Sequence, residues 1–185
     1  MTRVHIKKGP FVQMITSCVY FYRNEHYGLC FGKKEGSSYT IEHVVSDSKA
    51  KRTPNNLELN NRRLRRIKNL ESLLNCERIG DFHSHTGDSK MKAVDGPSDD
   101  DILFMDGEVN EGKDFIYVIL AINDQAKKQV WSRAVYGSIY GSIGEGYYCN
   151  IGAYHFDHFS KKTGHGIYKP AKIVCPYALK SKRYL

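Results

Sequence analysis

The sequence predicts a mixed α+β fold in which a central, mostly antiparallel or mixed β-sheet is flanked by helices. Three observations favour this fold. Apolar residues recur at helical spacing over residues 11–22, and several later runs are rich in β-branched and aromatic residues. With 185 residues, 41% hydrophobic and 26% charged, the chain has the size and composition of an ordinary globular domain. We therefore expect one domain over residues 1–185.

The first half of the chain is expected to form a helix, a hairpin and a second helix. Residues 11–22 form the first amphipathic helix. Two β-rich segments, 27–33 and 39–46, are separated by a polar loop with a glycine, which is typical of an antiparallel hairpin. A polar loop at 46–56 then leads to a helix predicted over about 57–75.

The second half is expected to be richer in strands. Strands are predicted at 78–83, 115–122, 129–136, 147–156 and 166–174, and a short helix at 99–105. We expect a core at about 11–136 that carries the functional motifs. Residues 137–185 then form a β-rich C-terminal extension, and the sequence leaves its strand pairing open.

The charge of the chain is basic, with a formal net charge of +8. Between Lys49 and Lys68 there are eight lysine or arginine residues and a single acid, Glu58. Such a segment attracts a phosphate backbone, but it is also typical of a solvated helix face. Nucleic acid is therefore a possible partner that charge alone does not establish.

The cysteine pattern and the N-terminus bear on the compartment. The five cysteines are scattered and contain no CxxC pair, which argues against a disulfide framework and a thiolate metal site. The apolar stretch at 11–22 is interrupted by polar residues, so no signal peptide or membrane span is predicted. We expect a cytoplasmic protein that does not enter membranes.

Two histidines and a carboxylate form the pattern with the clearest chemistry. His83 and His85 are two residues apart at the end of a predicted strand, so their side chains share a face. A catalytic zinc ion needs a third protein ligand and an open position, and Asp101 on the following helix is the best candidate. Each part of this pattern also has a simpler interpretation. A histidine pair is often only a surface or hydrogen-bonded pair, and Ser98 with Asp101 also forms a helix capping box.

With Glu25 included, the sequence resembles the JAMM/MPN+ family of zinc metalloproteases. The family pattern is a glutamate leading into a strand, then His-Ser/Thr-His, then Ser-x-x-Asp. This chain has Glu25 before the strand at 27–32, then His83-Ser84-His85, then Ser98-Asp99-Asp100-Asp101. The resemblance covers roughly residues 11–122 and implies a single MPN/JAMM-like domain.

The resemblance also implies a role for each matching residue. His83, His85 and Asp101 would bind one catalytic Zn²⁺, Glu25 would be the general acid/base, and Ser98 would stabilise the oxyanion.

Two departures from the family pattern concern the loop after the second histidine. The family usually has proline there and seven residues before the serine, whereas this chain has Thr86 and the longer segment 86–97. A shift in register would place Asp99 or Asp100 in the ligand position instead of Asp101.

The expected function is that of a zinc-dependent metallopeptidase or isopeptidase. By resemblance, its substrate would be an amide or isopeptide bond at the C-terminus of a ubiquitin-like protein, as in a deubiquitinase. Two alternatives remain open: an inert MPN-type interaction scaffold, and a nucleic-acid-associated protein resembling the RadC-like branch. The sequence leaves the physiological substrate and the oligomeric state undetermined.

Overall fold

The computed structural model describes residues 1–47, 61–87, 92–125 and 128–180. Within these ranges one sheet of ten strands has the order β10-β1-β3-β2-β4-β5-β8-β7-β6, with β9 paired to β8. The strands are β1 (Arg3–Ile6), β2 (Tyr27–Glu35), β3 (Ser38–Asp47), β4 (Glu77–Gly87), β5 (Ile116–Asp124), β6 (Ser132–Arg133), β7 (Ile139–Ile143), β8 (Tyr147–Phe159), β9 (Gly166–Pro170) and β10 (Lys172–Val174). The helices are α1 (Lys8–Tyr20), α2 (Asn61–Leu74), α3 (Asp99–Asn110) and α4 (Pro176–Lys180).

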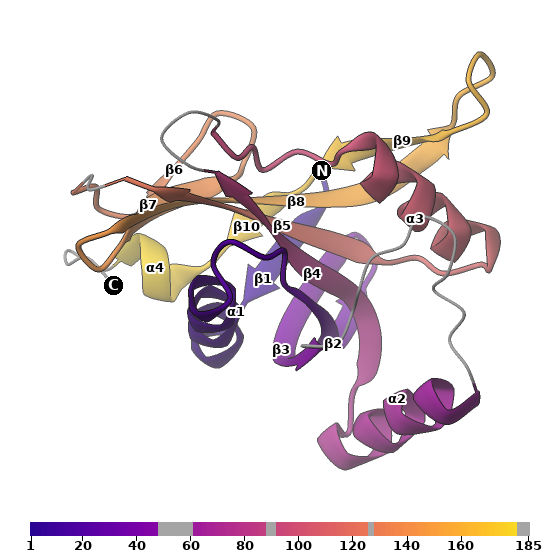
Figure 1. Ribbon diagram of the computed structural model, residues 1–185. Helices are drawn as coiled ribbons and strands as arrows, with labels where there is room; N and C mark the ends of the chain where they lie inside the picture. Colours follow the sequence, from indigo (N-terminus) through magenta and orange to yellow (C-terminus); the bar gives the residue numbers. More distant parts are fainter. Residues whose placement is uncertain (48–60, 88–91, 126–127, 181–185) are drawn as a thin grey trace.

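The predicted α+β fold, a central sheet flanked by helices, is wrong. The structure is a strand-rich mixed sheet that curls into a half-barrel and has few helices (Figure 1). Its ends are built by short strands such as β1 and β10, which pair in parallel although they lie at opposite ends of the chain. Strands of three or four residues are too short to give a periodic pattern, so the sequence did not reveal how far the sheet extends.

The elements of the first half follow their predicted positions closely. Helix α1 and the β2–β3 hairpin are confirmed, and Gly36 takes a positive φ of 57° in the hairpin turn. Helix α2 is confirmed over the described residues. Residues 46 and 47 of the predicted polar loop belong to β3, and the rest of that loop, the start of the predicted helix and most of the basic segment lie outside the described residues.

The second half differs more from the prediction. Strand β4 continues through both histidines to Gly87 instead of ending at His83, and α3 continues to Asn110. The strand expected at 129–136 is reduced to β6, and the one expected at 166–174 is divided into β9 and β10. Strands from the C-terminal third join the same sheet, because β8 pairs with β5 and β10 with β1.

The core has two sides, separated by the sheet. Helices α1 and α4 pack on the concave side, where Phe11 of α1 meets Trp131 and apolar strand residues. Helices α2 and α3 lie on the other side, in two smaller clusters around Tyr27 and Tyr117. Every residue of β5 from Ile116 to Asn123 is buried, so this central strand supports both cores.

Within the described residues, no helix combines the length and apolarity that a membrane crossing requires.

Candidate metal centre

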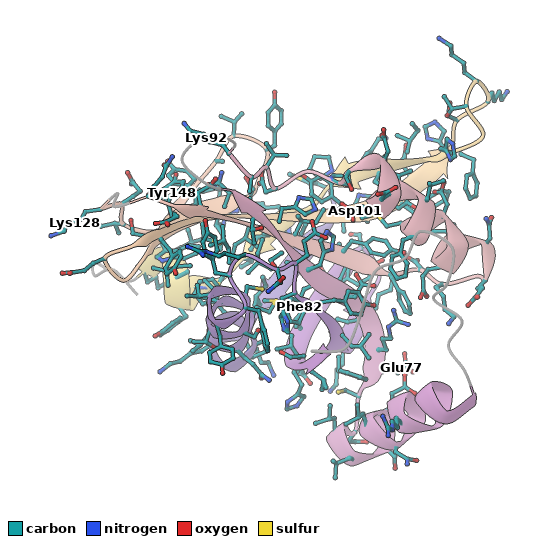
Figure 2. The ribbon with its side chains drawn as sticks, viewed as in Figure 1. Glu77, Phe82, Lys92, Asp101, Lys128 and Tyr148 are labelled. Carbon is teal, nitrogen blue, oxygen red and sulfur yellow. The ribbon has the colours of Figure 1, made fainter. Side chains whose placement is uncertain are left out.

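Strand β4 places both histidines on the same side of the sheet. It runs antiparallel to β2, with Tyr27 opposite His83, and parallel to β5. Alternate side chains of a strand share a face, so His83 and His85 point to the side of α3. Phe82, which precedes His83, points to the opposite face and packs in the core on the side of α1 (Figure 2).

Helix α3 supplies the carboxylate. Asp101 is fully buried in the first turn, and Figure 2 shows it on the α3 side of the sheet. The capping box predicted from the sequence is present. The backbone N–H of Asp101 donates to Ser98 Oγ at 3.2 Å, and the backbone N–H of Ser98 donates to Asp101 Oδ2 at 2.8 Å. Asp99 and Asp100 are exposed, so the structure places Asp101, and neither of these two, beside the histidines.

The three side chains converge closely enough to share one ion. His83 Nε2 lies 3.1 Å from His85 Nε2 and 3.3 Å from Asp101 Oδ1, and His85 Nε2 lies 3.1 Å from Asp101 Oδ2. Ligands about 2.05 Å from a tetrahedral zinc ion would be about 3.3 Å apart. This donor set fits Zn²⁺, and a facial set of two imidazoles and one carboxylate also suits Fe²⁺.

A loop carbonyl determines which nitrogen of His85 can bind metal. His85 Nδ1 lies 2.9 Å from the carbonyl oxygen of Val94. A carbonyl only accepts hydrogen bonds, so Nδ1 carries the proton and Nε2 of the neutral ring is left as a ligand. Burial alone would lower the pKa of His85, but the hydrogen bonds to Asp101 and Val94, with the charges of Asp101 and Glu25, raise it.

Glu25 lies in the short coil before β2 and is exposed. His26 bonds to Ser84 in both directions: the His26 N–H donates to Ser84 Oγ at 2.9 Å, and the Ser84 N–H donates to the His26 carbonyl at 2.8 Å. These bonds extend the β2–β4 pairing beyond Tyr27 and bring Glu25 alongside His85. The charge of Glu25 contributes to the raised pKa of His85, which agrees with this placement.

Ser98 is exposed at the start of α3, next to the buried ligand set. Its Oγ already accepts the Asp101 N–H bond, but a hydroxyl can accept and donate at the same time. The hydroxyl proton therefore stays available to a further acceptor. The structure brings the three predicted ligands into direct contact and places Glu25 and Ser98 at the rim.

Behind the ligands, a buried ionic group joins β4 to α3. Arg78 Nη2 lies 3.4 Å from Asp81 Oδ2 and 3.3 Å from Glu108 Oε1, and the hydroxyl of Tyr27 donates to Asp81 at 3.1 Å. Burial alone would lower the pKa of Arg78, but Tyr27, Asp81 and Glu108 raise it, so the guanidinium stays charged. This group fixes the helix that carries Asp101 against the strand that carries the histidines.

The sequence did not reveal two residues that support the site. Ser84 holds the backbone next to Glu25, and buried Asn123 accepts a hydrogen bond from the Ala93 N–H at 2.9 Å. A signal for each was present. Ser84 lies between the two histidines, and Asn123 is a polar residue at the end of a long apolar run.

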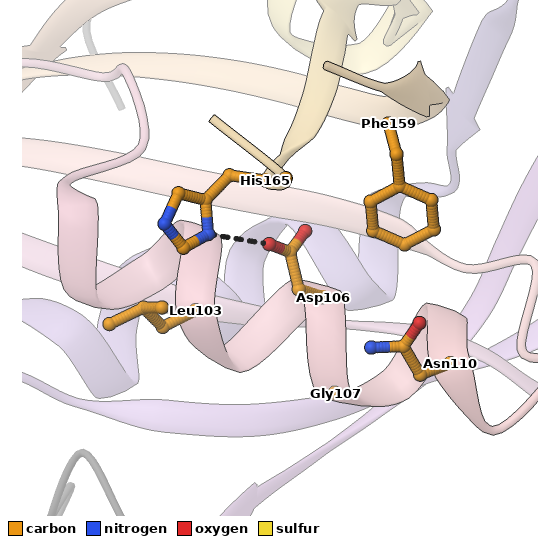
Figure 3. A pocket seen from close by; sticks show the side chains of 7 residues that line it. Leu103, Asp106, Gly107, Asn110, Phe159 and His165 are labelled. Carbon is orange, nitrogen blue, oxygen red and sulfur yellow. Dashed lines mark hydrogen bonds and ion pairs between the residues drawn. The ribbon is translucent and has the colours of Figure 1, made fainter. Parts of the chain in front are cut away.

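A separate pocket of about 460 Å³ lies between α3 and the β8–β9 hairpin (Figure 3). His165 Nδ1 lies 3.3 Å from Asp106 Oδ2, and Asp106 also accepts bonds from the Gly166 N–H and the Tyr168 hydroxyl. None of the residues described as lining it carries a hydroxyl or thiol that the imidazole could activate. These contacts therefore fasten the hairpin to the helix.

Comparison with known proteins gives a structural neighbour and no family. No family model matches the chain, and no curated protein matches it. The solution structure of protein DSY2949 from Desulfitobacterium hafniense aligns with a TM-score of 0.57, covering 96% of this chain and 95% of that one. The two sequences are 16% identical, so the likeness concerns the fold alone.

Proposed function

We propose that this protein is a zinc-dependent hydrolase of amide or isopeptide bonds. The observation that carries the proposal is the convergence of His83, His85 and Asp101 within 3.1–3.3 Å of one another. Glu25 and Ser98 at the rim supply the remaining groups of the pattern that resembles the JAMM/MPN+ metalloproteases. A buried ligand set beside exposed acid/base and hydroxyl groups suits a reaction with a substrate that arrives from solvent.

The chain's own residues would divide the work as follows. His83, His85 and Asp101 would hold the ion, which would supply the Lewis acidity that makes water a nucleophile near neutral pH. Glu25 accepts a proton from the attacking water and delivers it to the leaving amine. Ser98 donates its hydroxyl proton to the carbonyl oxygen as negative charge develops there.

The substrate class follows from the resemblance alone. We propose a protein substrate in which the C-terminal carboxyl of a ubiquitin-like modifier is joined to an amine. The five cysteines are all free and buried, which supports a reducing, cytoplasmic setting for this reaction.

The substitution Glu25→Gln tests the mechanism directly. It removes the base and leaves the ligands in place, so we expect one bound zinc ion per chain and at least about a 10²-fold fall in kcat. Metal content is measured by elemental analysis, and turnover with isopeptide-linked ubiquitin-like conjugates. Exposed Glu35→Gln, at the far end of β2, is the matched control and should retain full activity.

Unchanged turnover in Glu25→Gln would contradict the mechanism, and stoichiometric iron would contradict zinc. A metal-free, inactive protein recovered only in a complex would favour the inert interaction scaffold. Tight binding of duplex DNA with a steep dependence on salt would favour the nucleic-acid-associated alternative.

A further inference from the structure

We propose that Asn123 is a positioning residue that prepares His85 for metal binding by holding the loop segment at residues 92–97. This inference rests on the metal centre of the proposed function and concerns a residue outside the family pattern. It explains what the end of the long 86–97 segment does in this chain.

The side chain of Asn123 anchors the loop to β5. Asn123 lies near the end of β5 and is only 4% exposed. Its side-chain oxygen accepts the backbone N–H of Ala93 at 2.9 Å. Because β5 is parallel to β4 with Asn123 beside Gly87, this side chain projects on the same face as His85. The anchor thus fixes the returning loop next to the second histidine.

The anchored loop contacts the imidazole of His85. Val94, which follows Ala93, presents its carbonyl oxygen to His85 Nδ1 at 2.9 Å. This bond holds the ring in the tautomer whose Nε2 is free to bind an ion. Asn123, Ala93, Val94 and His85 therefore form a continuous series from the sheet to the metal position.

His85 is the most exposed of the three proposed ligands and depends most on this support. The side chain of His85 is 12% exposed, whereas those of His83 and Asp101 are 2% and 0% exposed. Packing alone orients the two buried ligands more firmly than the third. The loop carbonyl supplies the orientation that packing leaves incomplete at His85.

The test compares zinc affinity in Asn123→Leu and Asn123→Asp by competition with a chromophoric chelator. Leucine has a similar size but no acceptor, so we expect about 10- to 100-fold weaker binding, the range typical for loss of a group that supports a ligand. Aspartate keeps an oxygen for Ala93 and should stay within about threefold of the wild type. Asn123→Ala repeats the test if leucine disturbs folding.

Ser142→Ala is the matched control, since Ser142 is buried and accepts the backbone N–H of Gln129 in another loop. It should leave zinc affinity unchanged. The same Asn123→Leu substitution in a His85→Ala background should have no further effect, because the coupling acts through that ring. An equal loss in both backgrounds, or no loss in either, would overturn the proposal.

Nitrogen-15 NMR of the metal-free protein separates this inference from the proposed function. At about pH 8.5, His85 should carry its proton on Nδ1 in the wild type and in Asn123→Asp, and lose that preference in Asn123→Leu. An unchanged tautomer in Asn123→Leu would contradict the positioning role. Absence of hydrolysis by a zinc-loaded wild type would instead contradict the peptidase proposal and leave the positioning role standing.

Discussion

At the scale of single residues, the site uses groups that are already engaged in the fold. Ser98 caps α3 and Asp101 completes the capping box, yet both lie where the proposed reaction needs a hydroxyl and a ligand. The imidazole of His85 is hydrogen-bonded to the carbonyl oxygen of Val94, and the backbone N–H of His26, next to Glu25, is hydrogen-bonded to Ser84. Local structure and proposed chemistry therefore depend on the same hydrogen bonds.

Substitutions at Ser98 should separate the cap from the proposed oxyanion role. Ser98→Asn keeps a side-chain acceptor for the Asp101 N–H but has no hydroxyl, so stability should change by less than about 0.5 kcal/mol. If the hydroxyl stabilises the oxyanion, kcat should fall by about 10²- to 10³-fold. Thermal unfolding and steady-state kinetics measure the two effects, with Ser98→Thr as the control that retains both functions.

The close approach of the three proposed ligands could be predicted from the sequence because their geometry is local. Two histidines in alternation on a strand and a capping box around Asp101 each specify a short stretch of backbone. Asn123 stood out as a polar residue at the end of an apolar run, but its contact could not be predicted, because its partner Ala93 is 30 residues away and the contact depends on how a loop returns to the sheet. Long-range contacts of this kind leave no periodic trace in a sequence.

At the scale of elements, α3 is held in place by side chains from several strands. The Arg78–Glu108 pair joins it to β4, and Asp106 joins it to the β8–β9 hairpin. Asp114, in the link from α3 to β5, bonds to Lys34 and Tyr39 of the β2–β3 hairpin. The position of the helix, and hence of Asp101, reflects all of these contacts.

Removal of the Asp106 carboxylate should loosen the β8–β9 hairpin. Asp106→Ala leaves the Gly166 N–H and the Tyr168 hydroxyl without their acceptor, which should lower the free energy of unfolding by about 2–3 kcal/mol. Chemical denaturation measures the loss. Glu111→Ala, an exposed change near the end of the same helix, should stay within about 0.5 kcal/mol of the wild type.

The contribution of Asp114 should depend on pH. Burial alone would raise the pKa of Asp114, but Lys34 and Tyr39 lower it, so the folded state favours the charged form. Its stabilisation is therefore present above the unfolded-state pKa and lost as the pH falls through the folded-state pKa. Because the pair is well exposed, Asp114→Asn should cost about 0.5–1 kcal/mol at neutral pH, and urea unfolding should show this difference closing as the pH falls below the ordinary pKa of an aspartate. A difference that is constant with pH would contradict this origin.

At the scale of the whole molecule, the curled sheet brings distant parts of the chain together. Arg133 of β6 donates to the carbonyl oxygen of Ile173 in β10 at 2.6 Å, and the Ile173 N–H donates to the carbonyl of Gly137, so hydrogen bonds link β10 to the β6–β7 region. The sequence predicted the hairpin and the long strands, whose patterns are strong. It did not predict the curl, because short terminal strands are defined by their partners and not by their own composition.

Metal should stabilise the whole fold, since the proposed ligands come from both β4 and α3. Zinc at about 100 times its Kd should add about 2.7 kcal/mol, which corresponds to an increase in Tm of about 5–10 °C for a chain of this size. Differential scanning calorimetry with zinc, and then with excess chelator, measures the gain and its reversal. His83→Ala should abolish the shift, and a shift that persists in this variant would place the ion elsewhere.

Gly80 shows how far from the ligands an inactivating change can occur. A Cβ at this position would lie 1.8 Å from the carbonyl oxygen of Ile116, so any side chain forces β4 and β5 apart. The displaced strand is the one that carries both histidines. A genetic screen for inactive variants should therefore recover substitutions of Gly80 as readily as substitutions of His83 or His85, although Gly80 contributes no atom to the proposed metal centre.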